Sequence, residues 1–107
     1  MKAIIAYIQP FRLGRVIQEL IEIPNFPGVS VLNCRGFGRD VPLGLAFEVL
    51  KERERIEIVV PDTMVESIIE VRTREAHTGC PGDGAIFICE VNEAIRIRTG
   101  ERRVELP

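Results

Sequence analysis

The sequence predicts an α+β protein with the element order βαββαβ and a short extra strand at its C-terminal end. Three observations support this prediction. Short apolar runs of strand length occur along the chain, two segments repeat apolar residues at helical spacing, and proline or glycine separates these segments. With 107 residues, the chain has the size of a single domain, 1–107.

The first half of the chain predicts a strand, a helix and a second strand. The first strand is expected over residues 2–9, which are apolar on both faces, and Pro10 ends it. A helix follows, because apolar residues recur with a helical period. These residues are Leu13, Val16, Ile17, Leu20 and Ile21. Two prolines and a glycine within residues 23–28 end the helix, and residues 29–35 are predicted to form the second strand.

A long segment without a clear period, residues 39–53, separates the second strand from the third, which is expected over residues 55–60. It exceeds the usual length of a hairpin turn and therefore indicates a functional loop. Apolar residues alternate over residues 41–49. This alternation fits a further strand, an apolar docking hairpin or packing on the same subunit.

The second helix is expected after Pro61 and Asp62, which end the third strand. Thr63 and Glu66 have the spacing of a capping box at its start. Its apolar stripe consists of Val65, Ile68 and Ile69, and Ala76 extends it. The last two strands are predicted over residues 85–91 and 94–98.

This order matches the ferredoxin-like βαββαβ sandwich, in which both helices cover one face of the sheet. The first and fourth strands are nevertheless apolar on both faces. Because an open apolar face is too large to leave in water, we expect sheets of several subunits to pack together in a closed ring.

Composition narrows the class of function. The net charge of −2 argues against nucleic-acid binding by bulk charge, and no apolar run approaches the roughly 20 residues of a membrane helix. Cys34, Cys80 and Cys89 lack CxxC spacing, which indicates a reducing, cytoplasmic compartment. Cys89 lies in an apolar run and is expected in the core.

Few residues suit catalysis, whereas two features suit anion binding. The single histidine, His77, supports no catalytic constellation, and with Cys80 it provides too few ligands for zinc. Arg96 and Arg98 lie two apart on a predicted strand, so they share a face and form either a phosphate or carboxylate clamp or a solvated edge. The glycines around Asp83 are able to turn backbone N–H groups toward an anion.

Three segments occur in a fixed order on this framework: GFGR (36–39), TGCPGDGAIF (78–87) and RIRTGE (96–101). IEIVVPD (56–62) lies between the first two. With them, the chain resembles the PII signalling proteins from Met1 to about Arg102. These proteins are trimeric adenine-nucleotide sensors that control transporters and enzymes.

The resemblance implies a homotrimer with three nucleotide sites between neighbouring subunits. It places a partner-binding T-loop at about 39–54, a phosphate-cradling B-loop at about 78–85, and a C-terminal strand and tail at 94–107. The residues that match the nucleotide site are Ser30, Gly36, Phe37, Gly38, Arg39, Val59, Gly82, Asp83, Gly84, Ala85, Arg96 and Arg98. Arg96 and Arg98 match a pair that contacts phosphates from the adjoining subunit.

Departures from the family pattern suggest a PII-like branch with a shortened T-loop. Ala85 replaces a basic residue of the B-loop, which implies a preference for ADP or AMP over ATP. Asp40 replaces a glutamine; it suits magnesium but repels an anionic oxo-acid such as 2-oxoglutarate. The only tyrosine is Tyr7, so a T-loop tyrosine cannot be modified. Such branches are associated with transport of bicarbonate, metals or other solutes.

The resulting hypothesis is a non-enzymatic regulator that binds ATP, ADP or AMP. It is expected to control a membrane transporter or a cytoplasmic enzyme through residues 39–54. It is not expected to insert into a membrane or to bind nucleic acid. Slow ATP hydrolysis, seen in some members, is compatible with it. The alternative is a metal-binding trimer of the same fold, motivated by Cys34, His77 and Cys80. An acylphosphatase-like enzyme is disfavoured because residues 9–15 lack a glycine-rich phosphate loop.

Overall fold

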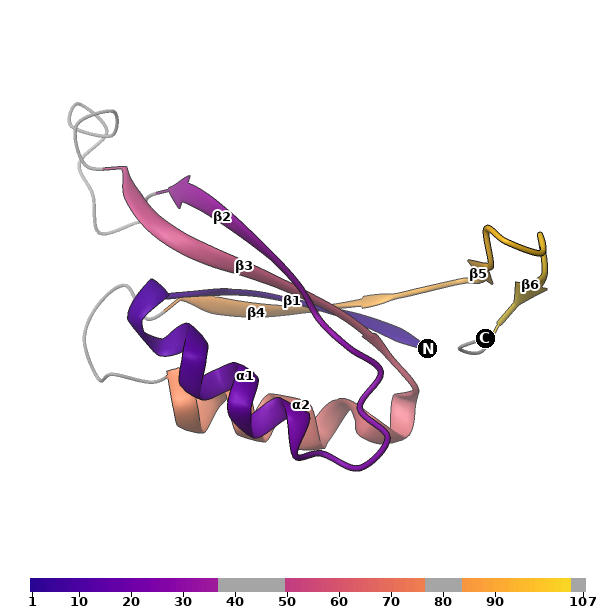
Figure 1. The fold of residues 1–107 in the computed structure, drawn as a ribbon, viewed down its shortest axis with the longest axis horizontal. Coiled ribbons are helices and arrows are strands. Elements are labelled where there is room, and N and C mark those ends of the chain that lie inside the picture. Colours follow the sequence, from indigo (N-terminus) through magenta and orange to yellow (C-terminus); the bar gives the residue numbers. More distant parts are fainter. Residues whose placement is uncertain (37–49, 77–83, 105–107) are drawn as a thin grey trace.

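A four-stranded antiparallel sheet with two helices on one face forms the body of the protein in the computed structural model (Figure 1). The structure describes residues 1–36, 50–76 and 84–104. Its elements are β1 (Lys2–Ile8), η1 (Pro10–Arg12), α1 (Leu13–Ile21), β2 (Ser30–Gly36), β3 (Lys51–Val60), η3 (Asp62–Met64), α2 (Val65–Ala76), β4 (Ala85–Glu90), β5 (Ala94–Ile95) and β6 (Arg102–Arg103). The strand order β2-β3-β1-β4 confirms the predicted ferredoxin-like fold.

The core lies between the helices and the two central strands. Ile4 of β1 pairs with Ile58 of β3, and alternate residues along both strands point to the same side because side chains alternate across a strand. Val16 and Leu20 of α1 and Ile68 of α2 meet this side and are fully buried. The helical period read from the sequence therefore identified the residues that close this face.

The third strand is longer than the sequence indicated. It begins at Lys51 rather than Arg55, and it stays in register with β2 up to the pair Gly36 and Lys51. Asn33 Nδ2 donates a hydrogen bond to Glu54 Oε1 at 3.1 Å across this ribbon. Residues 51–54 are charged and lack apolar alternation, so no hydrophobic pattern marks them as a strand.

The predicted capping box before α2 is wrong. Residues Asp62–Met64 form a 3₁₀ turn after Pro61, and neither Thr63 nor Glu66 makes a capping hydrogen bond among the residues that the structure describes. Asp62 instead accepts a hydrogen bond from the N-terminal ammonium group of Met1 at 2.8 Å. This ion pair ties the beginning of β1 to the end of β3.

Strands β5 and β6 form a small hairpin that stands away from the main sheet (Figure 1). The predicted strand 94–98 is shorter than expected, because only Ala94–Ile95 is extended. The backbone N–H of Arg96 donates to the carbonyl of Glu101 at 2.8 Å, and that of Gly100 donates to the carbonyl of Arg96 at 2.7 Å. The side chain of Ile97, at the tip, is 98% exposed.

Candidate functional site

The structure describes part of the predicted nucleotide site. Phe37, Gly38, Arg39, Gly82 and Asp83 lie outside the described residues, as do nearly all of the proposed T-loop and B-loop. The site residues that can be placed are Ser30, Gly36, Val59, Gly84, Ala85, Arg96 and Arg98.

Ser30 and Val59 lie on the face of the sheet that the helices leave uncovered. Ile58 and Val60 of β3 are buried on the helix side, so Val59 between them points to the opposite face, where it is 38% exposed. Ser30 pairs with Glu57, which lies two residues from Val59 and therefore on the same face. The two predicted site residues thus share one surface at neighbouring strands.

Gly84 occupies a position that no other residue can take without a shift of the backbone. Its φ of +106° lies in a region that L residues rarely adopt, and a Cβ built there would lie 1.8 Å from the carbonyl oxygen of Tyr7. The next residue, Ala85, begins β4 and pairs with Tyr7. The glycine therefore lets the chain that enters β4 pass tightly over the end of β1.

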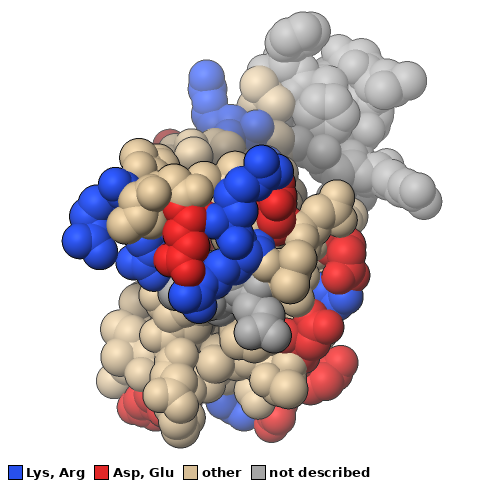
Figure 2. Space-filling view, turned by 90° about the vertical axis from the view of Figure 1, so that its right-hand side faces the viewer, with Lys and Arg blue, Asp and Glu red and all other residues tan. Residues whose placement is uncertain are grey.

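Arg96 and Arg98 are the free cations of the described hairpin. Arg102 pairs with Glu93, and Arg103 Nε donates to Glu101 Oε1 at 2.6 Å. Arg96 and Arg98 form no ion pair within residues 1–36, 50–76 and 84–104. Figure 2 shows this end of the molecule, where basic side chains gather with acidic ones among them.

The expectation that Arg96 and Arg98 share a strand face is wrong. Arg96 follows the last residue of β5, and Arg98 lies in the turn of the hairpin. The alternation that would align their side chains ends at Ile95, because a turn reverses the chain after only two residues of strand. Arg96 is half-buried and Arg98 is exposed, so the two guanidinium groups have different surroundings.

Within one chain, the placed residues do not converge on a single pocket. Strand β2 has 7 residues, so Ser30 and Gly36 at its ends lie roughly 20 Å apart at about 3.3 Å per residue. The β5–β6 hairpin projects from the opposite end of the molecule to Gly36 (Figure 1). One subunit therefore presents these residues as separate surfaces.

The uncovered face also carries a polar and aromatic cluster that the sequence did not reveal. Arg55 Nη1 donates to the hydroxyl of Tyr7 at 2.9 Å, and its Nε donates to Glu57 Oε1 at 2.8 Å. The guanidinium carbon lies 5.6 Å from the centroid of the Tyr7 ring, a cation–π distance. Phe87 meets Tyr7 edge to face, with ring centroids 6.4 Å apart.

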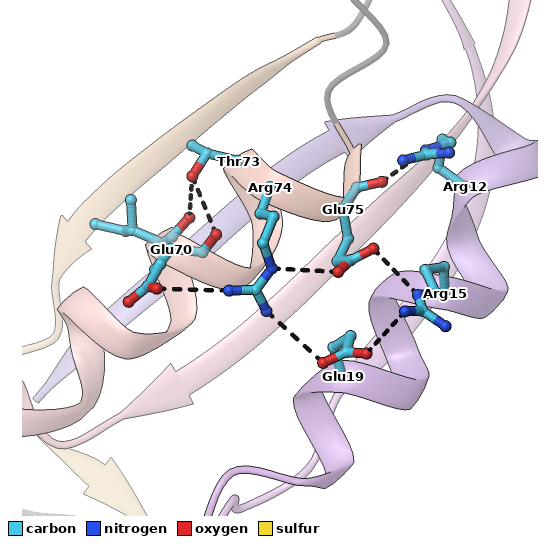
Figure 3. Close-up of polar contacts among 8 residues, drawn as sticks. Arg12, Arg15, Glu19, Glu70, Thr73, Arg74 and Glu75 are labelled. Carbon is cyan, nitrogen blue, oxygen red and sulfur yellow. Dashed lines mark hydrogen bonds and ion pairs between the residues drawn. The ribbon is translucent and has the colours of Figure 1, made fainter.

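A polar network fixes the end of α2 from which the chain continues toward Gly84 (Figure 3). Arg12 Nε donates to the carbonyl oxygen of Glu75 at 2.6 Å. Arg15 and Arg74 each donate to the Glu75 carboxylate at 3.2 Å. Partial burial acts to raise the pKa of Glu75, but the hydrogen bonds from Arg74 and Arg15 outweigh it and hold this pKa below its ordinary value of 4.5.

The metal alternative finds no cluster of ligands in the described part of the chain. No group of three or more His, Cys, Asp and Glu side chains suited to a metal ion occurs there. His77 and Cys80 lie outside the described residues, and Cys34 is half-buried. Cys89, expected in the core, is exposed, because its alternating position on β4 points to the uncovered face beside Ala3.

No helix among the described residues is long and apolar enough to cross a membrane. The fold and the surfaces described above define a small α+β protein with a glycine-only turn and a projecting arginine hairpin. A sequence model of the family described as Nitrogen regulatory protein P-II matches residues 1–101. The chain therefore belongs to the P-II family and is a signal-transduction regulator by that membership.

Several relatives match nearly the whole chain, and each is named Nitrogen regulatory protein P-II or P-II 1. The protein of Rhodospirillum rubrum is 43% identical over 108 residues, which cover 95% of this chain and 96% of the relative. That of Azospirillum brasilense is 41% identical with the same coverage. P-II 1 of Escherichia coli K12 is 41% identical over 107 residues, covering 94% and 95%. The assignment to a branch with a shortened T-loop stays a prediction.

Proposed function

We propose that the protein is a homotrimeric sensor that binds an adenine nucleotide between subunits and controls a transporter or an enzyme through residues 39–54. The observation that carries this proposal is the β5–β6 hairpin, which projects from its own sheet and holds Arg96 and Arg98 without ion pairs among the described residues. Two unpaired guanidinium groups on a projecting element suit the phosphates of a ligand held against another subunit.

The uncovered sheet face supports assembly. Phe87 is 52% exposed and Leu32 is 48% exposed on this face, although both are large apolar residues. The hairpin itself has strands of two residues, too little to be stable in water without support. In a trimer, the sheets and hairpins of three copies would pack together. Each copy would then cover the apolar residues that its neighbour exposes and support its neighbour's short hairpin.

The glycine turn supports the phosphate end of the site. Gly84 requires a backbone that other residues cannot adopt, and such turns leave N–H groups accessible to an anion. Ala85, which follows it, supplies no charge for outer phosphates. We therefore propose ADP or AMP as the preferred ligand over ATP, with Asp40 available to magnesium when a nucleotide binds. Bicarbonate is a candidate second ligand.

A calorimetric titration with ADP tests this proposal. Arg96→Ala and Arg98→Ala are each expected to weaken ADP binding by about tenfold or more, because each removes a charge-assisted hydrogen bond of about 1.5–3 kcal/mol. Arg102→Ala is the matched control: it removes the same side chain from the same hairpin, but that side chain already pairs with Glu93. It should bind ADP like the native protein.

Equal affinity of Arg96→Ala, Arg98→Ala and the native protein would contradict the proposed site. A loss of the same size in Arg102→Ala would show that the hairpin charge acts through its overall field rather than through two phosphate contacts. Circular dichroism spectra and the elution volume of each variant show whether fold and assembly are retained.

A further inference from the structure

Arg72 is a buried cation without a partner in the described structure. It lies on α2 and is 1% exposed, and it is the only charged residue among the buried residues that the structure describes. Its Nε, Nη1 and Nη2 atoms have no hydrogen-bond partner there. By contrast, Arg74 on the same helix pairs with Glu19, Glu70 and Glu75.

The charge of Arg72 persists at neutral pH. Burial lowers the pKa of Arg72 from its ordinary value to about 10, which still leaves the guanidinium group protonated near pH 7. A buried charge is costly unless an opposite charge or several hydrogen bonds compensate it. The described residues around Arg72 provide neither, so this position favours the binding of an anion.

Arg72 also lines a cavity on the helix side of the sheet. The cavity has a volume of about 410 Å³ and lies between α2 and the edge strand β4. This volume is within the range of about 300–1,000 Å³ that is usual for small-molecule sites. Ile69 and Ala76 of α2 and Ile86 and Ile88 of β4 contribute aliphatic walls.

Among the described residues that line the cavity, Arg72 alone is charged. Thr73, the neighbouring hydroxyl, already donates to the carbonyl oxygens of Ile69 and Glu70 at 2.8 and 3.2 Å. The Tyr7 hydroxyl, on the other face, accepts from Arg55 at 2.9 Å. The described lining of this open cavity thus carries one positive charge on an otherwise largely apolar surface.

We propose that this cavity is a binding site for a small organic monoanion, with one carboxylate on Arg72 and a short aliphatic body against the isoleucines. One unpaired guanidinium group matches one carboxylate in charge. Because its nitrogens have almost no exposed surface, the Arg72 side chain must turn toward the cavity to form a bidentate pair. Aliphatic walls favour a hydrocarbon body over a second polar group. The site borders the proposed nucleotide site, because Gly84 and Ala85 belong to both. Its cation is Arg72 on the helix side, however, and neither Arg96 nor Arg98 lines it.

The test is a titration of the full chain with hexanoate, followed by calorimetry or by NMR shifts of the Ile86 and Ile88 methyl groups. Hexanamide, of nearly the same shape but uncharged, and inorganic phosphate are titrated in parallel. We expect saturable binding of one hexanoate per chain and binding of hexanamide and phosphate that is weaker by about tenfold or more. The comparison needs no variant, so it holds whether or not substitutions at Arg72 fold.

Arg72→Met keeps an unbranched stem in the side chain but removes the guanidinium group and its charge, and it should weaken hexanoate binding by about tenfold or more. Arg74→Met is the control, since it changes an arginine on the same helix that already has carboxylate partners and does not line the cavity. Absence of saturable hexanoate binding to the native chain would overturn the proposal. Binding of hexanamide or phosphate as tight as that of hexanoate, or undiminished hexanoate binding to folded Arg72→Met, would also overturn it.

Discussion

The two faces of the sheet are built from the same strands, but one is covered by helices and the other is exposed in a single subunit. On the helix side, Ile4, Ile56 and Ile58 are buried by α1 and α2. On the other side, Phe87 and Leu32 remain about half exposed. Both faces carry large apolar residues, but one subunit buries those of the helix side alone. In the proposed trimer, other copies of the chain cover the apolar residues of the second face.

The largest expected effect comes from placing a charge on the uncovered face. Phe87→Glu is expected to convert the proposed trimer to monomers, because the carboxylate would have to be buried unpaired between sheets. Phe11→Glu is the matched control: Phe11 is 69% exposed but belongs to the turn η1 and not to a strand of the sheet. Size-exclusion chromatography should show a change of mass for Phe87→Glu alone. An unchanged mass for both variants would mean that the uncovered face is not the interface.

A smaller effect, on stability, is expected at Gly84, which precedes the edge strand β4. Gly84→Ala should lower the free energy of unfolding by roughly 2–3 kcal/mol, because its methyl group would collide with the Tyr7 carbonyl at a strained φ. Gly14→Ala provides the contrast, since a Cβ there meets nothing within 4 Å in α1. It should be neutral or add up to about 1 kcal/mol. Urea denaturation at one protein concentration measures both, and equal effects would show that Gly84 is an ordinary turn residue.

The order of elements and the closed face of the sheet were predictable from the sequence, because each rests on a periodic apolar pattern. The start of β3 at Lys51 was not, since residues 51–54 are all charged and show no apolar alternation. The turn at Arg98 was missed for a related reason. Apolar and charged residues alternate from Ile95 to Arg98 as they would in a strand, yet the chain reverses there.

The candidate site was predictable where a motif constrains the backbone, as at Gly84. Arg55 and Arg72 were not recognised, because their importance depends on which side chains the fold brings near them. A long charged residue on a helix is normally read as solvent-facing. Only the packing of α2 on the sheet shows that Arg72 points inward.

The smallest expected effect lies on the covered side, in the network around Glu75. Its pKa is lowered by folding, so its contribution to stability is present above its ordinary value of 4.5 and is lost as the pH falls below that value. Glu75→Gln should therefore reduce the loss of stability on acidification and leave the oligomeric state unchanged. Urea midpoints compared near neutral pH and in mild acid check this, and an identical acid dependence of variant and native protein would contradict it.

Sedimentation equilibrium of the native full chain tests most directly whether copies of the chain cover the uncovered face. The proposed trimer predicts one species of three chain masses over a wide range of protein concentration. A stable monomer, with Phe87 and the β5–β6 hairpin left in water, would contradict it.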